Sequence, residues 1–489
     1  MTKRVLPNLL LLAAAAVTAA PAAAEVVGMY GNTPSRNMVS PETGLPAEWN
    51  LETGQNLLWT VPLGSQSYGG PVVAGDQIYV GTNNEGLRNP KLTGDRGNMM
   101  AFDKKTGEFL WQSAHTKLPA GRVHDWPLQG VCSGPYIEGD RIYYVSNQAE
   151  LIAADTQGFR DGENDGPYKD EENTSELDED VVWKLDMIDE LDVFPHNLAV
   201  GSPLIVGDLL FTVTGNGVDE GHINIPSPLA PSFIAVNKKT GELVWENDAP
   251  DGKILHGQWS NPTYGKAGGR EQIVFPGGDG WLYSFEPETG KEIWRFDANP
   301  KDSVWELGGA GTRNNIISTP VFYKDRVYIG VGQDPEHGEG VGNFWVIDAT
   351  KTGDVTGTGV VWHRGGEEFR RTISTAAIAD GIVYIADLSG FLYALDAETG
   401  EHYWTYDTFA AVWGSAFVAD GKVYLGDEDG EVVVIRAGKG KGGEPEVLAE
   451  HALGSAVYTT PVASDGVLYI ASRNRLYAFK EGARSAPSR

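Results

Sequence analysis

Eight short apolar hairpins recur along this 489-residue chain, and they constrain its fold more than any other feature. Each consists of two runs rich in Val, Ile and Tyr on either side of a turn that contains Gly or Asp. β-Branched and aromatic residues around a tight turn predict paired antiparallel strands. A β unit repeated every roughly 45–65 residues predicts an all-β fold, an eight-bladed β-propeller whose blades bury their faces against one another. The copies lie at residues 71–81, 135–146, 203–215, 261–278, 320–332, 376–390, 416–430 and 461–474.

A second motif, Thr-Gly followed by three residues and a Trp, comes after four of these hairpins. Glycine tolerates the positive φ of the turn into an outer strand. We expect the large indole to lie between adjacent blades. The last hairpin lacks the motif, whereas LETGQNLLW at residues 51–59 precedes the first hairpin. We therefore predict that the N-terminal strand around Trp59 completes the last blade and closes the ring, which removes its open edges. The four copies lie at residues 102–111, 236–245, 285–294 and 395–404.

The N-terminus predicts a secretory signal peptide over residues 1–24. Lys3 and Arg4 precede an apolar stretch, Leu9–Ala20, and small residues follow up to a cleavage site near Ala24. The residue directly after that site is Glu25 and not Cys, so we do not expect a lipid anchor there. No later segment approaches the roughly 20 apolar residues that a membrane-spanning helix needs. The protein is therefore expected to be periplasmic or secreted.

The rest of the chain is predicted to form one large domain. Residues 25–48 are expected to be an N-terminal wrapping segment, residues 49–480 the propeller and residues 481–489 a disordered tail. Insertions interrupt the repeats, and such loops usually carry the functional features that distinguish one repeat protein from another. They lie at residues 158–182, 217–231, 333–342, 351–359 and 437–446.

Charge and cysteine content exclude several functions. The chain carries 38 Lys and Arg residues against 67 Asp and Glu residues, a net charge of −29. Such a surface repels phosphate backbones and anionic lipid headgroups, which disfavours nucleic-acid and membrane-surface binding. It favours a basic partner or a salt-rich, acidic setting. The single Cys, Cys132, excludes an internal disulfide and a CxxCH attachment of c-type haem.

The hairpins and the Trp motif together resemble the pyrroloquinoline quinone (PQQ) repeat propellers. That family includes quinoprotein alcohol dehydrogenases and the outer-membrane assembly lipoprotein of the β-barrel assembly machinery. The resemblance implies an eight-bladed ring. In the dehydrogenases it also implies PQQ beneath a metal ion, usually calcium, that Glu, Asn and Asp hold, with an aspartate as general base. TVTGNG at residues 212–217 resembles the family's Gly-Asn stretch and makes Asn216 the candidate metal ligand.

Other positions depart from the dehydrogenase pattern. The stretch where the family carries its base reads DGKILHGQW at residues 251–259 and offers His256 or Gln258 instead of Asp. Residues 194–203, where the Trp under the quinone is expected, contain no Trp. The adjacent-cysteine disulfide found in many members cannot form with one Cys.

In a propeller, the residues just before each innermost strand converge on one mouth of the central channel. Reading that position blade by blade gives a set of Arg, His and aromatic residues that is unusual in so acidic a chain. Arg donates to carboxylates through a forked guanidinium, and aromatic faces suit a planar ligand. The set predicts a small anionic or quinone-sized ligand; the alternative is a hydrated channel whose polar residues satisfy strand ends. The candidates are Tyr68, His124, Trp126, His196, Asn197, His256, Gln258, Arg313, Asn314, Arg371, Trp413 and Tyr458.

The insertion GFRDGENDGPYKDEEN at residues 158–173 resembles a calcium loop. Its alternating carboxylates could surround one hard cation, while Gly166 permits the sharp turn. The alternative is a solvated acidic loop. The candidate ligands are Asp161, Glu163, Asp165 and Glu172.

Two functions are consistent with the sequence. The first is an exported propeller that binds a small ligand or a protein partner without the standard dehydrogenase residues. The second is a PQQ- and metal-dependent alcohol or sugar dehydrogenase that passes electrons to a separate cytochrome. The second would use Asn216 and a displaced base, either His256 or Asp125.

Overall fold

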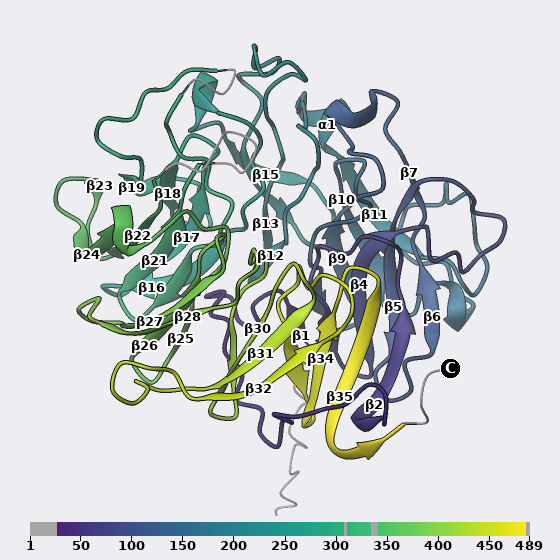
Figure 1. The fold of residues 1–489 in the computed structure, drawn as a ribbon. Coiled ribbons are helices and arrows are strands. Elements are labelled where there is room, and N and C mark those ends of the chain that lie inside the picture. The colour runs from purple at the N-terminus through teal and green to yellow at the C-terminus, as the bar shows by residue number, and fades with distance from the viewer. Residues whose placement is uncertain (1–26, 308–310, 334–340, 486–489) are drawn as a thin grey trace, which may run out of the picture.

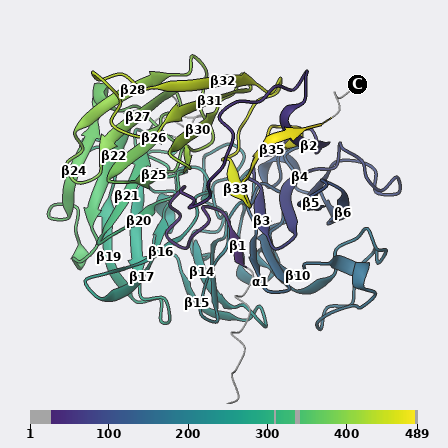
Figure 2. The same cartoon turned by 90° about the horizontal axis from the view of Figure 1, so that it is seen from below.

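The computed structural model describes residues 27–307, 311–333 and 341–485, which form an eight-bladed β-propeller (Figures 1 and 2). Eight sheets of four or five strands follow one another around a central axis, as the hairpin repeats predict. The first strand of each repeat lies at the inner edge of its blade, except in the second blade, where an N-terminal strand lies inside it, and several inner strands of neighbouring blades touch. The predicted signal peptide falls within residues 1–26, outside the described part. No helix in the described ranges has the length and apolar character to cross a membrane.

The first four blades run outward from their inner strands. The first contains β3 (Val72–Ala74), β4 (Gln77–Asn83), β5 (Arg96–Asp103) and β6 (Phe109–Gln112), with β7 (His115–Thr116) paired to β5. The second contains β8 (Tyr136–Glu138), β9 (Arg141–Val145), β10 (Glu150–Asp155) and β11 (Val181–Asp186). The third contains β12 (Leu204–Val206), β13 (Leu209–Val213), β14 (Phe233–Asn237) and β15 (Leu243–Asn247). The fourth contains β16 (Thr263–Ala267), β17 (Arg270–Pro276), β18 (Trp281–Phe285) and β19 (Glu292–Asp297), extended by β23 (Gly353–Asp354).

The remaining blades follow the same order. The fifth contains β20 (Val321–Tyr323), β21 (Arg326–Val331), β22 (Asn343–Asp348) and β24 (Val360–Gly365). The sixth contains β25 (Ala377–Ala379), β26 (Ile382–Ala386), β27 (Phe391–Asp396) and β28 (His402–Asp407). The seventh contains β29 (Phe417–Ala419), β30 (Lys422–Gly426), β31 (Glu431–Arg436) and β32 (Val447–Ala452). The eighth contains β33 (Val462–Ser464), β34 (Val467–Ala471), β35 (Arg475–Arg484) and β2 (Gln55–Pro62). Helical turns lie between strands: α1 (Met187–Leu191), η1 (Gly121–Val123), η2 (Gly158–Asp161), η3 (Asp251–Lys253) and η5 (Gly366–Glu368).

Both ends of the chain contribute to the eighth blade. β2 pairs antiparallel with β35, and Trp59 lies opposite Ala478. The indole Nε1 of Trp59 donates to the carbonyl of Lys104 in the first blade at 3.3 Å. Gln55 lies opposite Arg484, so residues 481–484 belong to a strand and not to the predicted disordered tail. That this pairing stabilises the ring by closing it remains a prediction.

The Trp motif packs one blade against the next. Trp245 of the third blade donates from Nε1 to the carbonyl of Pro287 in the fourth at 2.8 Å. A methyl group at Gly290, which has a φ of 66°, would lie 2.7 Å from Cδ2 of Trp245. The Thr-Gly turn therefore provides a flat surface on which the preceding blade's indole packs. Trp294 differs, because it donates to Gln272 in its own sheet at 2.7 Å. The same Trp–Gly packing joins Trp59 to Gly107, Trp183 to Gly241 and Trp362 to Gly400.

The N-terminal segment crosses one end of the ring (Figure 2). β1 (Val27–Met29) pairs with β8 as an additional inner strand. Beyond β1, the carbonyls of Pro34 and Ser35 accept hydrogen bonds from the backbone amides of Tyr264 and Phe322. The backbone of Val418, on the far side of the ring, bonds to Met38 and Ser40. The segment therefore connects inner strands of several blades and covers the channel at this end.

Arg36 anchors this segment. Its side chain is 0% exposed, and its guanidinium donates to four backbone carbonyls at 2.7–2.9 Å. Burial lowers the pKa of Arg36 to about 10. Buried charged groups are costly unless their donors are satisfied, so this arrangement fixes the path of the segment. The acceptors are the carbonyls of Tyr30, Ser202, Pro203 and Pro262.

Candidate ligand-binding cavity and histidine cluster

A cavity of about 380 Å³ lies at the centre of the ring. The segment before the inner strand of every blade contributes at least one residue to its lining, from Tyr68 in the first blade to Tyr458 in the eighth. Tyr30 of the N-terminal segment also lines it. The predicted convergence of these segments on one place is therefore present in the structure. Six of the twelve predicted ligand-binding residues line the cavity, namely Tyr68, Trp126, Asn197, His256, Trp413 and Tyr458.

Aromatic side chains dominate the wall. The rings of Tyr68 and Tyr458 stack with centroids 5.0 Å apart, and Trp413 meets Tyr458 edge-on at 5.8 Å. Burial raises the pKa of Tyr68 to about 12, so its hydroxyl stays protonated at neutral pH. Among the described residues of the lining, none is Arg, Lys, Asp or Glu. Flat apolar surfaces without a charged group favour a planar, uncharged ligand.

The other predicted mouth residues lie outside this lining. His124 packs edge-on against Phe194 at 4.4 Å. The Gln258 amide donates to the Asn216 carbonyl at 3.4 Å, and the Asn314 amide donates to the Ala298 carbonyl at 3.1 Å. Arg313 and Arg371 do not line the cavity either, and His196 lies behind its wall.

Of the three residues that a dehydrogenase would use, Asp125 and Asn216 lie outside the cavity lining and are engaged in structural contacts. The carboxylate of Asp125 is 0% exposed, pairs with Lys117 and accepts from the Asn147 amide at 2.9 Å. Burial raises its pKa despite these partners. Asn216 accepts from the Phe194 amide at 3.0 Å and donates to the Ser227 carbonyl at 2.9 Å.

These contacts bear on whether PQQ and a metal ion would fit. PQQ carries three carboxylates, and the described lining offers no cationic side chain to receive them. Asn216, the candidate metal ligand, is 0% exposed and uses both atoms of its amide group within the protein. The residues present therefore do not fit PQQ with a calcium ion.

Three histidines meet directly behind the cavity wall. His196 and His256 are each 1% exposed, and His222 is partly exposed. Their ring centroids lie 4.4–4.8 Å apart, and one ring nitrogen of each lies within 4.8 Å of the others. His256 belongs both to this cluster and to the cavity lining. The sequence analysis did not select His222. The only signal that could have found it is its place in the insertion at residues 217–231, which interrupts the repeat.

The acidic loop distributes its carboxylates among separate partners. Asp161 accepts from the backbone amide of Glu163 at 2.9 Å. Asp165 pairs with Arg141 at 2.8 Å, and Glu172 lines a second cavity. Across the described residues, the histidine cluster is the one group of three or more potential metal ligands that converges. Calcium binding by the loop stays a prediction.

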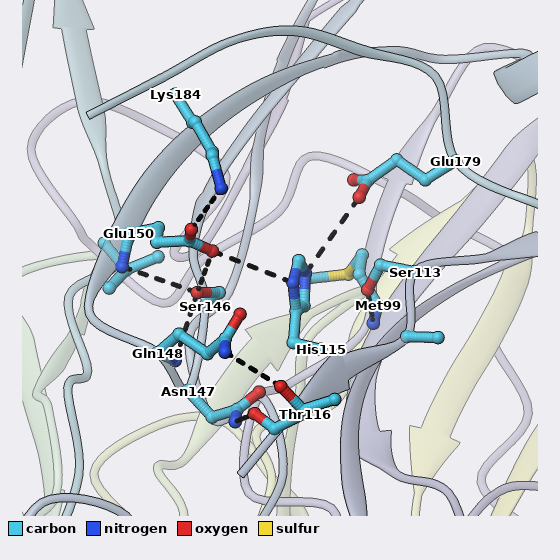
Figure 3. Close-up of polar contacts among 12 residues, drawn as sticks. Met99, Ser113, His115, Thr116, Ser146, Asn147, Gln148, Glu150, Glu179 and Lys184 are labelled. Atoms are coloured by element: carbon cyan, nitrogen blue, oxygen red, sulfur yellow. Dashed lines mark hydrogen bonds and ion pairs between the residues drawn. The ribbon is translucent and has the colours of Figure 1, made fainter. Parts of the chain in front are cut away.

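The second cavity, of about 290 Å³, lies between the first and second blades and holds a buried titratable network (Figure 3). His115 lies between Glu150 and Glu179 and shares a 2.7 Å hydrogen bond with the hydroxyl of Tyr144. Tyr144 donates to Glu179 at 2.7 Å, while Lys184 donates to Glu150 at 2.6 Å. Burial lowers the pKa of His115 to about 4 and raises that of Glu179 to about 8. The pair is therefore neutral at neutral pH.

Comparison with known proteins identifies the family. A PQQ-repeat family model described as "Outer membrane protein assembly factor BamB" matches residues 17–113, 181–352 and 278–443. A similar relative is the dehydrogenase subunit of a quinone-dependent alcohol dehydrogenase from Gluconacetobacter polyoxogenes. It is 31% identical over 225 residues, which is 35% of this chain and 29% of the relative. Outer membrane protein assembly factor BamB of Shewanella oneidensis is 24% identical over 304 residues, 61% of this chain and 58% of that protein. The chain thus spans less than two thirds of either relative.

Solved structures agree with the fold. BamB from Moraxella catarrhalis superposes with a TM-score of 0.52 at 14% identity, over 88% of this chain and 98% of that chain. A europium-containing methanol dehydrogenase superposes with a TM-score of 0.58 at 14% identity, over 92% and 97%. At this level of identity the likeness concerns the propeller fold alone.

Proposed function

Because the chain belongs to the PQQ-repeat propeller family described as outer membrane protein assembly factor BamB, we propose that it binds a small, planar, uncharged ligand outside the cytoplasm. The single observation that carries this proposal is the aromatic cavity of about 380 Å³ at the ring axis, with no charged residue in its described lining. Its volume falls within the roughly 300–1,000 Å³ typical of small-molecule sites. The predicted signal peptide and the extracytoplasmic role of the family support the location.

The proposal differs from the alternative, a PQQ-dependent dehydrogenase. Local identity to a quinone-dependent alcohol dehydrogenase supports that alternative. The engaged side chains of Asp125 and Asn216 and the uncharged lining count against it. The proposed ligand is also uncharged, unlike the anion that Arg313 and Arg371 suggested from the sequence.

Quenching of tryptophan fluorescence tests the proposal, because Trp126, Trp259 and Trp413 line the cavity. Menadione, a neutral planar quinone, is the probe. We expect saturable quenching with one site per chain. Trp413→Ala should weaken binding about tenfold, since one aromatic contact contributes about 1.4 kcal/mol. Trp305→Ala is the matched control: Trp305 is 38% exposed, does not line the cavity and donates to the Lys253 carbonyl.

Three results would contradict the proposal. Non-saturable quenching, or an equal loss in both tryptophan variants, would remove the cavity as the binding site. Oxidation of an alcohol with PQQ, calcium and a dye acceptor, lost in Asn216→Ala or His256→Ala, would establish the dehydrogenase instead. We expect no such oxidation.

A protein partner is the second candidate, supported by apolar side chains on the insertion at residues 217–231. Ile223 and Leu229 are 70% and 79% exposed. Exposed apolar groups of this kind are typical of docking surfaces. A photo-crosslinking residue at position 223 should capture a specific partner in cells, and the same group at Val360, in an outer strand, should not.

A further inference from the structure

The three clustered histidines come from three different segments of the third and fourth blades. His196 follows α1, His222 lies on the insertion between β13 and β14, and His256 precedes β16. The Nε2 atoms of His196 and His222 are 3.1 Å apart, and a nitrogen of His256 lies within 4.8 Å of both. Long-range folding thus assembles a group of imidazoles that no local motif encodes.

Backbone hydrogen bonds fix the relative positions of the three segments. The amide of His196 donates to the Gly215 carbonyl at 3.3 Å, and the amide of Val218 donates to the His256 carbonyl at 2.9 Å. Gly217 lies between them, where a methyl group would come within 2.5 Å of the His256 carbonyl oxygen and 2.6 Å of the His196 Cβ. The close approach of the imidazoles therefore requires glycine at this position.

A further contact determines which tautomer a neutral His196 ring adopts. Its Nδ1 lies 2.7 Å from the carbonyl of Val218, which can only accept, so Nδ1 carries the proton. The lone pair of the neutral ring is then on Nε2, directed toward His222. A ligating histidine commonly donates its other ring nitrogen to a carbonyl in this way, which orients the ring and increases its basicity.

The loop that carries His222 is held in a constrained conformation. His222 has a φ of 54°, in the left-handed region that a residue with a Cβ rarely adopts. Its amide donates to the carbonyl of Asp219 at 2.9 Å, and the Asp219 carboxylate accepts from the amide of Ile223 at 2.7 Å. The turn thus holds the imidazole toward the cluster at a cost in backbone strain.

We propose that His196, His222 and His256 bind one divalent transition-metal ion of the zinc and copper class. Two nitrogens bound to one tetrahedral metal at 2.0–2.1 Å lie about 3.3 Å apart, close to the 3.1 Å between the first two histidines. Imidazole nitrogen suits Zn²⁺, Cu²⁺ and Ni²⁺, whereas Ca²⁺ prefers oxygen ligands. The site is separate from the acidic loop and from Asn216.

Three protein ligands leave at least one coordination position for water or for a donor atom of another molecule. Because His256 also lines the aromatic cavity, a ligand in that cavity with an oxygen or nitrogen donor could occupy this position. This extension rests on the proposed function, whereas metal binding by the three histidines does not.

Zinc titration of the chelator-treated full-length protein at pH 7.5 tests the site. We expect one Zn²⁺ per chain, and His222→Ala should weaken binding at least about 100-fold, since even indirect partners of a metal ligand often contribute 10–100-fold. His222 is partly exposed, so its replacement should leave the fold intact, which the melting curve checks. The matched control is His402→Ala: His402 is exposed, bonds to Thr405 and should leave zinc binding unchanged.

Cobalt substitution gives an independent readout. Co²⁺ in a site of low coordination number produces visible bands that are absent for hexahydrated Co²⁺, and excess Ca²⁺ should not remove them. Imidazole added to the Co²⁺ form should change these bands, even if menadione does not bind the cavity. Three results would overturn the proposal: no stoichiometric Zn²⁺ binding, equal affinity in the wild type and His222→Ala, or equal loss in His402→Ala.

Discussion

Replacing Glu179 with glutamine should change how the stability of this protein depends on pH. Glu179 lies in the network of Figure 3, and burial raises its pKa from 4.5 to about 8. Between these two values the folded protein retains a proton that the unfolded chain has lost. The free energy of unfolding must therefore fall as pH rises through this window. At about 1.4 kcal/mol per pH unit, the whole interval corresponds to at most about 5 kcal/mol.

His115 titrates in the opposite direction. Burial lowers its pKa from 6.5 to about 4, so its contribution to stability is lost as pH falls from 6.5 to 4. The two groups oppose one another between pH 4.5 and 6.5. Between pH 6.5 and 8 His115 is largely neutral in both the folded and the unfolded protein, so Glu179 dominates the change that this pair makes in the free energy of unfolding. The change is about 2 kcal/mol over 1.5 pH units.

Urea unfolding at half-unit steps from pH 6.5 to 8 measures this effect. The wild type should lose about 2 kcal/mol across the range because of Glu179. The neutral amide of Glu179→Gln does not titrate. The free energy of unfolding of this variant should therefore rise by the same amount relative to that of the wild type between pH 6.5 and 8. Glu163→Gln removes an exposed carboxylate from the same insertion and should keep the wild-type slope.

Parallel slopes for the wild type and Glu179→Gln would refute the reasoning, because they would mean that Glu179 is ionised in the folded protein. Infrared difference spectra give a second readout at pH 7. The carbonyl band of a protonated carboxyl group should be present in the wild type and absent from Glu179→Gln.

Three further predictions concern the ring and its acidic insertion. Gly290→Ala should destabilise the protein by at least about 2 kcal/mol, because the methyl group meets Trp245 and the positive φ disfavours alanine. Gly381→Ala has a similar positive φ but open space, and should cost only about 1 kcal/mol; equal losses would contradict the packing role. Removing residues 25–60 should expose the edge of β35 and cause aggregation, and a soluble, cooperatively unfolding product would contradict closure by the N-terminal strand. If the acidic insertion binds calcium, calcium should raise the melting temperature and the Asp161→Ala, Glu172→Ala double variant should lose the rise; an unchanged response would place any calcium elsewhere.

The blades were predictable because their determinants are local. A hairpin needs only two apolar runs and a turn. The Thr-Gly turn and the Trp that follows it also lie within a few residues of one another, so the sequence alone shows the motif. The same logic identified β2 as a strand, since residues 51–59 carry the Trp motif that the last hairpin lacks. The pairing of Trp59 with the strand of Ala478 agrees with this expectation.

The site was only partly predictable, because its residues depend on exact offsets between blades. Counting back from the inner strands selected Trp413 and Tyr458, which line the cavity. In two other blades it selected Arg313 and Arg371, whereas Ile317 and Ile373 line the cavity there. The connecting segments differ in length and path, so a fixed offset selects neighbours of the lining residues.

The contacts of the N-terminal segment were not predictable for a different reason. Arg36 bonds to backbone carbonyls, which every residue possesses, so no side-chain pattern indicates its partners. His222 gave equally little warning, because a single histidine in a loop becomes informative only when folding brings it to His196.

The cavity brings together parts of the chain that lie far apart in sequence. Its lining draws on all eight blades, and Tyr30 adds a residue from the segment that Arg36 anchors across the channel. If a ligand binds there, we expect it to contact blades from both ends of the chain and so to favour the structure in which β2 pairs with β35. By mass action, ligand at 100 times its Kd would add about 2.7 kcal/mol to the stability of the closed state. Binding to the cavity should therefore protect the β2–β35 pairing from hydrogen exchange, although neither strand contributes a residue to the described lining.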